Sequence, residues 1–184
     1  MFSNGGLVSY VKNGYKVEYL KTLYVTSTIF ESLSLEITLP SGKKIAVTNL
    51  YKPPRNNTNE NISLFLNEFT PLLDKIDNKY ECSIFGGDLN IDLLKIFQRE
   101  LYNDYFELFL HRGFIPLITM PTRFSAQNAT LIDHIFVKMK NFPNIFSSIL
   151  LKKISDHLPT VCALPFSKYH TSKPVFVTQT SVKP

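Results

Sequence analysis

Two short segments carry the residues of this chain that are best suited to phosphodiester hydrolysis. Phe85–Asn90 and Ser155–Pro159 each place acid, amide or imidazole groups just after an apolar run. Two glycines in the first segment let the backbone turn tightly, so Asp88 and Asn90 are expected to project from a sheet edge. Asp88 suits the activation of a water molecule, and Asn90 suits holding that water or the phosphate. A plain turn accounts for the same Gly-Asp-x-Asn sequence about equally well.

Asp133 lies inside a strongly apolar run, where an unpaired carboxylate would be costly. His157 is its natural partner, because a buried carboxylate fixes the imidazole tautomer and favours the protonated form, which can then donate to a phosphoryl oxygen. A structural salt bridge is the alternative interpretation. His134 alternates to the opposite face of the strand and is expected to be structural. The sequence therefore predicts one pocket formed by four side chains, those of Asp88, Asn90, Asp133 and His157.

Length and composition fit one domain with a hydrophobic core, since the chain has 184 residues of which 44% are hydrophobic. We expect the domain over residues 1–165 and a polar tail or linker over 166–184. The excess of 20 Lys and Arg over 15 Asp and Glu favours a polyanionic partner such as DNA. The sequence has no apolar run long enough to cross a bilayer and no signal-peptide pattern, so we expect no membrane partner and an intracellular location, with the nucleus as one candidate compartment.

Alternating apolar residues predict two β-hairpins in the first fifty residues. Residues 7–11 and 15–19 flank an Asn-Gly turn signal. Residues 33–39 alternate Leu or Ile with Ser, Glu and Thr, and the β-rich segment 43–50 returns after a Pro-Ser-Gly turn. This alternation places the leucines and the isoleucine of the second hairpin on one face of its first strand.

The pattern then changes to apolar steps of three and four over residues 62–76, which predicts a helix with one face packed on a sheet. Pro71 removes a backbone donor inside this stretch, so a kink or a break is expected there. Asp92 is expected to cap the next helical stretch, and Asn103 to cap a short helix that stops at Gly113. Short β-like runs follow, so the order of elements predicts an α/β sandwich of hairpins and helices.

Four motifs, taken in order, resemble those of the endonuclease/exonuclease/phosphatase superfamily, which includes deoxyribonuclease I-like nucleases and abasic-site repair endonucleases. The motifs are N-L-Y-K-P-P at 49–54, G-D-L-N at 87–90, I-D-H-I at 132–135 and S-D-H-L-P at 155–159. A glycine-led segment that ends in Val-Lys-Asn at 5–13, together with the Tyr-x-Pro-Pro loop, is most similar to the endonuclease domains of non-LTR retrotransposons.

The resemblance implies a four-layer α/β/β/α sandwich, with the site at one edge of two paired sheets. It implies that Asp88 activates water and that Asn90 orients the water or the phosphate. It also implies that His157, held by Asp133, stabilises the charged phosphoryl oxygens. Asp156 is similar to the metal-linked acid of the family, so the implied cofactor is Mg²⁺ or Mn²⁺ and the implied substrate is DNA.

Two further residues match the family pattern less specifically. Tyr51 is similar to a tyrosine whose hydroxyl reaches the phosphate, with a core tyrosine as the alternative. Thr122 resembles a residue whose hydroxyl contacts the DNA backbone, with a loop threonine of no particular role as the alternative. Longer relatives also carry a reverse transcriptase, which makes such a domain a candidate partner.

The chain departs from the family pattern before Gly5. Members begin with a strand that carries an Asn and a later strand that carries the metal-binding Glu, whereas the first Glu here is Glu18. We therefore expect a domain without its N-terminal strands, weak metal binding by Asp156 and Asp88 alone, and a chain that is nearly inactive and marginally folded. Three functions stay open: a metal-dependent DNA endonuclease, an inactive relic or nucleic-acid-binding remnant, and a phosphatase or lipid phosphodiesterase of the same superfamily.

Overall fold

The computed structural model describes most of the chain, namely residues 6–54, 58–140, 145–152, 154–165 and 175–179, the last by its backbone alone. Gly5 and most of the segment expected to be a tail lie outside the described residues. The described elements, in chain order, are β1 (Lys16–Tyr19), η1 (Lys21–Leu23), β2 (Val25–Thr26), β3 (Glu31–Thr38), β4 (Lys44–Tyr51), α1 (Asn59–Lys79), β5 (Cys82–Asp88), η3 (Leu93–Gln98), α2 (Glu100–Leu110), β6 (Ile115–Pro116), β7 (Arg123–Phe124), β8 (Ala129–Thr130), β9 (Asp133–Met139), β10 (Phe146–Ile149), β11 (Thr160–Leu164) and β12 (Val175–Gln179).

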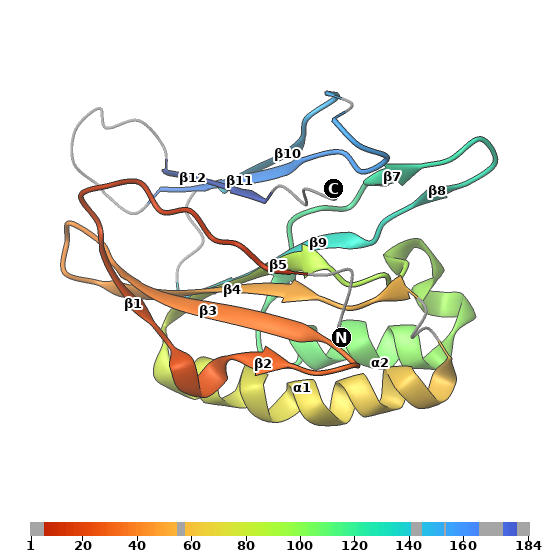
Figure 1. Cartoon of the computed structure of the whole chain (residues 1–184), viewed down its shortest axis with the longest axis horizontal. Helices are drawn as coiled ribbons and strands as arrows, with labels where there is room; N and C mark the ends of the chain where they lie inside the picture. Colours follow the sequence, from red (N-terminus) through yellow and green to blue (C-terminus); the bar gives the residue numbers. More distant parts are fainter. Residues whose placement is uncertain (1–5, 55–57, 141–144, 153, 166–174, 180–184) are drawn as a thin grey trace.

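A seven-stranded sheet forms the centre of the fold, with strand order β1-β3-β4-β5-β9-β6 and with β2 paired to β3. Its pairs are antiparallel, except that β4 and β5 run parallel. The helices α1 and α2 lie on one face of this sheet, and the three-stranded sheet β10-β11-β12 lies on the other (Figure 1). An α layer and two facing β layers of the expected four-layer sandwich are therefore present, and the described residues form no helix on the outer face of the three-stranded sheet. None of the described helices is long and apolar enough to cross a bilayer.

The second expected hairpin is confirmed, but the first is wrong. Strands β3 and β4 pair over eight positions, with Leu35 opposite Val47. Residues 6–11 form no strand, and β1 pairs with β3 instead. The Asn-Gly turn signal acts only locally, whereas the eight-residue β3 offers β1 a complete row of hydrogen-bonding partners. Residues 6–11 instead lie against β4, where the Asn49 Nδ2 donates to the Ser9 Oγ at 2.6 Å.

Strand β3 buries the face that its sequence pattern suggests is the exposed one. Ser32, Ser34 and Glu36 are buried, whereas the alternating Leu33 and Leu35 are only half-buried. The polar side chains are satisfied beneath the helical layer, for example through a 3.0 Å hydrogen bond between Ser34 and Thr48, the opposite residue of β4, and through donation from the Tyr80 hydroxyl to Glu36 at 2.6 Å.

Helix α1 continues unbroken through Pro71 for 21 residues, so the expected break does not occur. Pro71 lies on the exposed face, while the buried residues on either side of it include Phe69 and Leu73. Burial of such side chains, worth about 1.5–3 kcal/mol each, offsets the cost of about 3 kcal/mol for an interior proline. The Thr70 hydroxyl also donates to the Leu66 carbonyl at 2.6 Å.

The second helix begins earlier than expected. Helix α2 starts at Glu100, after Arg99 in an extended conformation, rather than at Asn103. Its buried stripe already includes Tyr102, so packing extends the helix past the capping signal in the sequence. Gly113, with φ +77°, is confirmed as the residue that turns the chain after the helix, and its N–H donates to the Leu110 carbonyl.

A compact aromatic core between the helices and the seven-stranded sheet fixes β5 and β9. The rings of Phe109 on α2 and Phe136 on β9 stack with centroids 4.1 Å apart, and Phe85 on β5 meets Phe109 edge-on at 5.6 Å. Such packing locks strand positions because interior side chains tolerate few alternative arrangements. Ile84, the neighbour of Phe85 on the opposite face of β5, is buried as well. The carboxyl end of β5 and the beginning of β9 are thus held rigidly next to each other, at the same end of these two interior strands.

The segment expected to be a polar tail contributes a strand. Strand β12 pairs with β11 in antiparallel register, with Val177 opposite Cys162. The alternating, β-branched sequence Val175–Gln179 is typical of a strand, and the polar residues around it masked that signal.

Candidate active site

The site lies where β5 ends and β9 begins. Asp88 and Asp133 are opposite each other in the antiparallel pairing of the two strands, and both are buried. The two glycines lie inside β5 rather than in a turn. A Cβ at Gly87 would lie 1.8 Å from the Leu50 carbonyl oxygen of β4, so glycine is required for the close approach of these strands.

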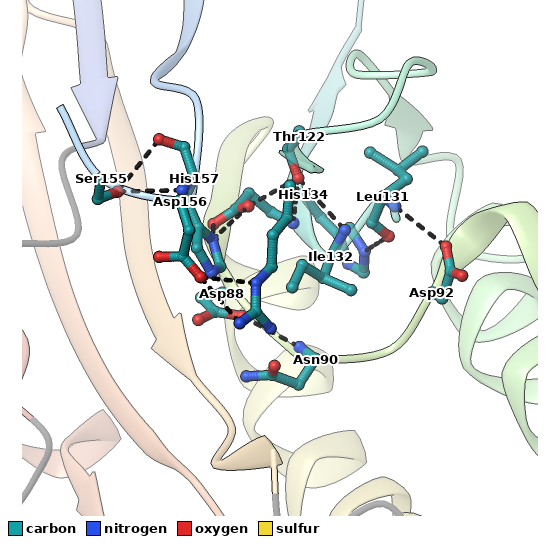
Figure 2. A network of polar contacts seen from close by, with 12 residues as sticks. Asp88, Asn90, Asp92, Thr122, Leu131, Ile132, His134, Ser155, Asp156 and His157 are labelled. Atoms are coloured by element: carbon teal, nitrogen blue, oxygen red, sulfur yellow. Dashed lines mark hydrogen bonds and ion pairs between the residues drawn. The ribbon is translucent and has the colours of Figure 1, made fainter. Parts of the chain in front are cut away.

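Asn90 makes the turn that follows β5. Its φ of +50° is in the left-handed region, which asparagine tolerates better than most residues. Its backbone N–H donates to an Asp88 carboxylate oxygen at 3.3 Å, and its side-chain Nδ2 donates to the Lys52 carbonyl at 2.8 Å. The side-chain amide of Asn90 is therefore held by the Lys52 carbonyl, while its backbone is bonded to Asp88, which Figure 2 draws between Asn90 and His157.

Asp133 and His157 form the expected pair. The His157 Nδ1 lies 2.8 Å from one carboxylate oxygen of Asp133 and 3.0 Å from the other. The Thr122 hydroxyl donates to the Asp133 Oδ2 at 2.6 Å and is itself fully buried. Thr122 therefore orients the carboxylate, and its contact with a DNA backbone stays a prediction.

His157 combines a raised pKa with one uncommitted ring nitrogen. Burial alone would lower the pKa of His157, but the hydrogen bond to Asp133 and the charges of Asp133, Asp88 and Asp156 raise that pKa above its ordinary value. Because Nδ1 donates to Asp133, the Nε2 is the remaining donor, and it is buried without a hydrogen-bond partner among the described residues. A protonated imidazole in this position could donate to an oxygen anion placed in the pocket.

His134, by contrast, is structural, as expected. Its Nε2 donates to the Leu131 carbonyl at 3.1 Å, and its Nδ1 accepts from the Tyr105 hydroxyl at 2.9 Å. Burial lowers the pKa of His134 to about 4, so the ring is neutral near pH 7.

Asp88, Asp133 and His157 could together hold a metal ion. Each offers a ligand atom, and these atoms all lie within 4.8 Å of one another. Two carboxylates and a neutral imidazole suit a divalent cation, whereas a protonated His157 would leave only the two carboxylates as ligands. Asp133 is bonded to both His157 and Thr122, and Asp88 accepts from the Asn90 backbone N–H.

Asp156, the expected metal-linked acid, has a different partner. The Arg123 Nε and Nη2 both lie 2.8 Å from its Oδ2. Partial burial raises the pKa of Asp156, but the ion pair with Arg123 outweighs that effect and lowers the pKa. No sequence pattern signals this contact, because the two residues are 33 positions apart, with Arg123 at the start of a two-residue strand and Asp156 in a loop.

Lys52 is a second charged residue that the sequence did not single out. It follows Tyr51, which lies opposite Asp88 in the pairing of β4 and β5, and its backbone N–H donates to the Asp88 carbonyl at 2.9 Å. The lysine is completely buried, and burial together with the charge of Arg99 lowers its pKa to about 8, against the opposing effect of Asp88. Tyr51 is thus placed beside the site, although its expected hydroxyl contact with phosphate stays a prediction.

Comparison with known proteins supports the fold. No protein-family model and no curated protein matches the sequence. The structure is similar to the endonuclease domain of TRAS1, a telomere-specific non-LTR retrotransposon, with a TM-score of 0.61 and 15% identity over 82% of this chain and 67% of that one. It is also similar to endonuclease/exonuclease/phosphatase family proteins from Beutenbergia cavernae (TM-score 0.56, 17% identity, 72% of this chain and 38% of that one) and Leptotrichia buccalis (0.50, 16%, 74% and 54%).

These similarities confirm the deoxyribonuclease I-like fold that the four motifs predict. At 15–17% identity they establish the fold alone. The chain spans only 38% and 54% of the two bacterial proteins, so its activity has to be argued from its own site.

Proposed function

We propose that this chain is a phosphodiester hydrolase domain that cleaves DNA with the help of a divalent cation. The observation that carries the proposal is His157, whose Nδ1 is bonded to the buried Asp133 while its Nε2 is buried without a hydrogen-bond partner among the described residues. A ring nitrogen of His157 also lies within 4.8 Å of an Asp88 carboxylate oxygen. A protonated imidazole held in this way can stabilise the charge that develops on a phosphoryl oxygen. The structural likeness to nucleases supports phosphodiester hydrolysis as the reaction class.

The remaining residues take roles that follow from their contacts. Asp88 accepts the proton of the attacking water, while Asn90, fixed by the Lys52 carbonyl, orients that water or the phosphate. Asp133, oriented by Thr122, keeps the imidazole of His157 in the tautomer that leaves Nε2 as a donor. A divalent cation, Mg²⁺ or Mn²⁺, held at Asp88 would polarise the phosphoryl oxygen and lower the pKa of bound water.

DNA is the proposed substrate for two reasons. The chain has a net charge of +5, which favours a polyanion. Its structure is also similar to an endonuclease domain from a retrotransposon. We accordingly propose a retrotransposon origin, a reverse transcriptase region as partner and the nucleus as the place of action.

The test is cleavage of an end-labelled DNA duplex by the 184-residue chain in Mg²⁺, in Mn²⁺ and in EDTA. An excess of protein over DNA is needed, because the small set of metal ligands predicts slow turnover. His157→Ala and Asp88→Ala should each lower the rate at least about 10²-fold. His111→Ala is the matched control, since His111 is exposed and pairs with Glu107 on α2. Equal cleavage by all three variants would assign the chemistry to other residues.

A second candidate function is DNA binding without hydrolysis. The ion pair of Asp156 with Arg123 favours it, because this carboxylate is then less available to a metal ion. Binding of the duplex without cleavage in either metal would support this alternative.

A further inference from the structure

Arg123 joins the two segments that build the site. Its backbone forms an isolated antiparallel bridge with His157, and it begins β7, which pairs with β8. The neighbouring Thr122 carbonyl accepts from the Leu158 N–H at 2.7 Å. The position of Arg123 is therefore fixed by main-chain contacts, independently of its side chain.

The Arg123 side chain has another partner, the carboxylate of Asp156. Both contacts, from Nε and Nη2, go to the same oxygen, and the two side chains are 40% and 47% exposed. Ion pairs this exposed contribute only about 0–1 kcal/mol to stability. Since backbone hydrogen bonds already join the two segments, the pair is not needed to hold them together.

The charges around the pocket give the guanidinium a second use. Asp88, Asp133 and Asp156 all act on His157 electrostatically, so even a protonated His157 leaves the cluster negative. A phosphodiester approaching that cluster would be repelled. Arg123 places a permanent positive charge at the exposed rim, and the planar fork of a guanidinium matches the oxygens of a phosphate group.

We propose that Arg123 binds a phosphate of the DNA backbone at the rim of the pocket, and that it exchanges the Asp156 carboxylate for the phosphate oxygens when DNA arrives. Before DNA binds, the ion pair with Asp156 holds the guanidinium. This inference rests on the proposed function, because it assumes that the pocket receives a phosphodiester.

The test measures DNA binding rather than cleavage. The anisotropy of a fluorescent duplex is titrated with the 184-residue chain in EDTA, over a series of salt concentrations. Arg123→Gln should weaken binding several-fold at low salt and reduce the slope of log affinity against log salt by about one. Arg123→Lys should keep most of that slope. The matched control is Arg112→Gln, because the Arg112 guanidinium pairs with Asp74 within the helical layer.

Asp156→Asn separates the proposal from a purely structural role. If Arg123 binds phosphate, this variant should bind DNA more tightly than the wild type, because it removes a negative charge and releases the guanidinium. If the pair only holds the loops, Arg123→Gln and Asp156→Asn should weaken binding to the same extent with an unchanged salt slope, and the proposal is wrong. Circular dichroism melts confirm that each variant is folded.

The experiments distinguish a failure of the Arg123 proposal from a failure of the hydrolase proposal. Binding that depends on Arg123, without cleavage in any metal, would overturn the hydrolase and keep this inference. Suppose instead that His157→Ala abolishes cleavage while Arg123→Gln leaves DNA binding unchanged. That result would support the hydrolase and overturn the role of Arg123. No binding of DNA by the wild-type chain would overturn the role of Arg123 outright.

Discussion

His134 and His157 are almost equally buried, at 2% and 5% exposure, yet their surroundings have opposite effects on them. His134 has two neutral partners, a hydroxyl and a carbonyl, and burial lowers its pKa to about 4. His157 has a carboxylate on one nitrogen and, within the part of the chain that the structure describes, no partner on the other, and its pKa is raised despite burial. The comparison shows that partner chemistry, and not depth in the fold, separates a structural histidine from a candidate catalytic one.

Among the changes we consider, Asp133→Asn should have the largest effect on the difference between the two histidines. The change removes the largest of the effects that raise the pKa of His157 and leaves the smaller ones of Asp88 and Asp156, so that pKa should fall and less of the imidazole should be protonated at pH 7. We expect DNA cleavage to fall about 10³-fold, within the usual range for a general acid–base group. Cleavage rates and the NMR titration of the imidazole measure the two effects. Asp77→Asn, which removes the partner of Lys138 at the far end of β9, is the control. A His157 pKa that stays raised would contradict the explanation.

The two histidines should also affect stability in opposite pH ranges. Unfolded His134 binds a proton near pH 6.5, whereas folded His134 does so only near 4. Its stabilisation is therefore present above pH 6.5 and is lost as the pH falls toward 4, by on the order of 3 kcal/mol. His157 has a folded pKa above its unfolded value, so its stabilisation is present at low pH and is lost as the pH rises through the folded pKa.

Urea unfolding at a series of pH values tests this difference. His134→Gln should reduce the acid loss of stability, and His157→Gln should reduce the loss at higher pH. His111→Gln, at an exposed site, should leave the loss of stability at acid pH and the loss at higher pH almost unchanged. The same pH profile for all three variants would mean that other groups control the stability.

The smallest expected effect is that of Thr122→Val. The change removes a 2.6 Å hydrogen bond to Asp133 and also the acceptor for the Asp133 N–H, at a cost of about 1–2 kcal/mol of unfolding free energy. Cleavage should fall only several-fold, and Thr122→Ser should restore it. A loss as large as that of Asp133→Asn, with an unchanged His157 pKa, would instead indicate direct contact between Thr122 and DNA.

The pairing of Asp133 with His157 could be predicted from sequence because a carboxylate inside an apolar strand requires a partner. The order of the motifs likewise predicted the fold and the position of Asp88 beside this pair. The first prediction depends on local chemistry, whereas the second depends on the resemblance of the motifs to those of a known superfamily. The comparison with solved structures agrees with the fold.

Other features depend on contacts between distant segments, which sequence patterns do not encode. The alternation in β3 shows that its two faces differ, but only the position of α1 decides that Ser34 and Glu36 are the buried ones. The burial of Lys52 depends in the same way on the elements that surround the end of β4. The contact between Arg123 and Asp156 arises where the start of β7 meets the loop that precedes β11.

The close approach at Gly87 limits how this protein can change. No other residue fits between the backbones of β4 and β5, because the first side-chain carbon would already overlap the Leu50 carbonyl. Position 87 is therefore a poor choice for any mutational library. In the same parallel pairing Tyr51 lies opposite Asp88, so a sequence that spread these strands would shift both residues together. Substitutions that aim to change the substrate should therefore be made in the loops that follow β4 and β5, and the strands themselves should be kept.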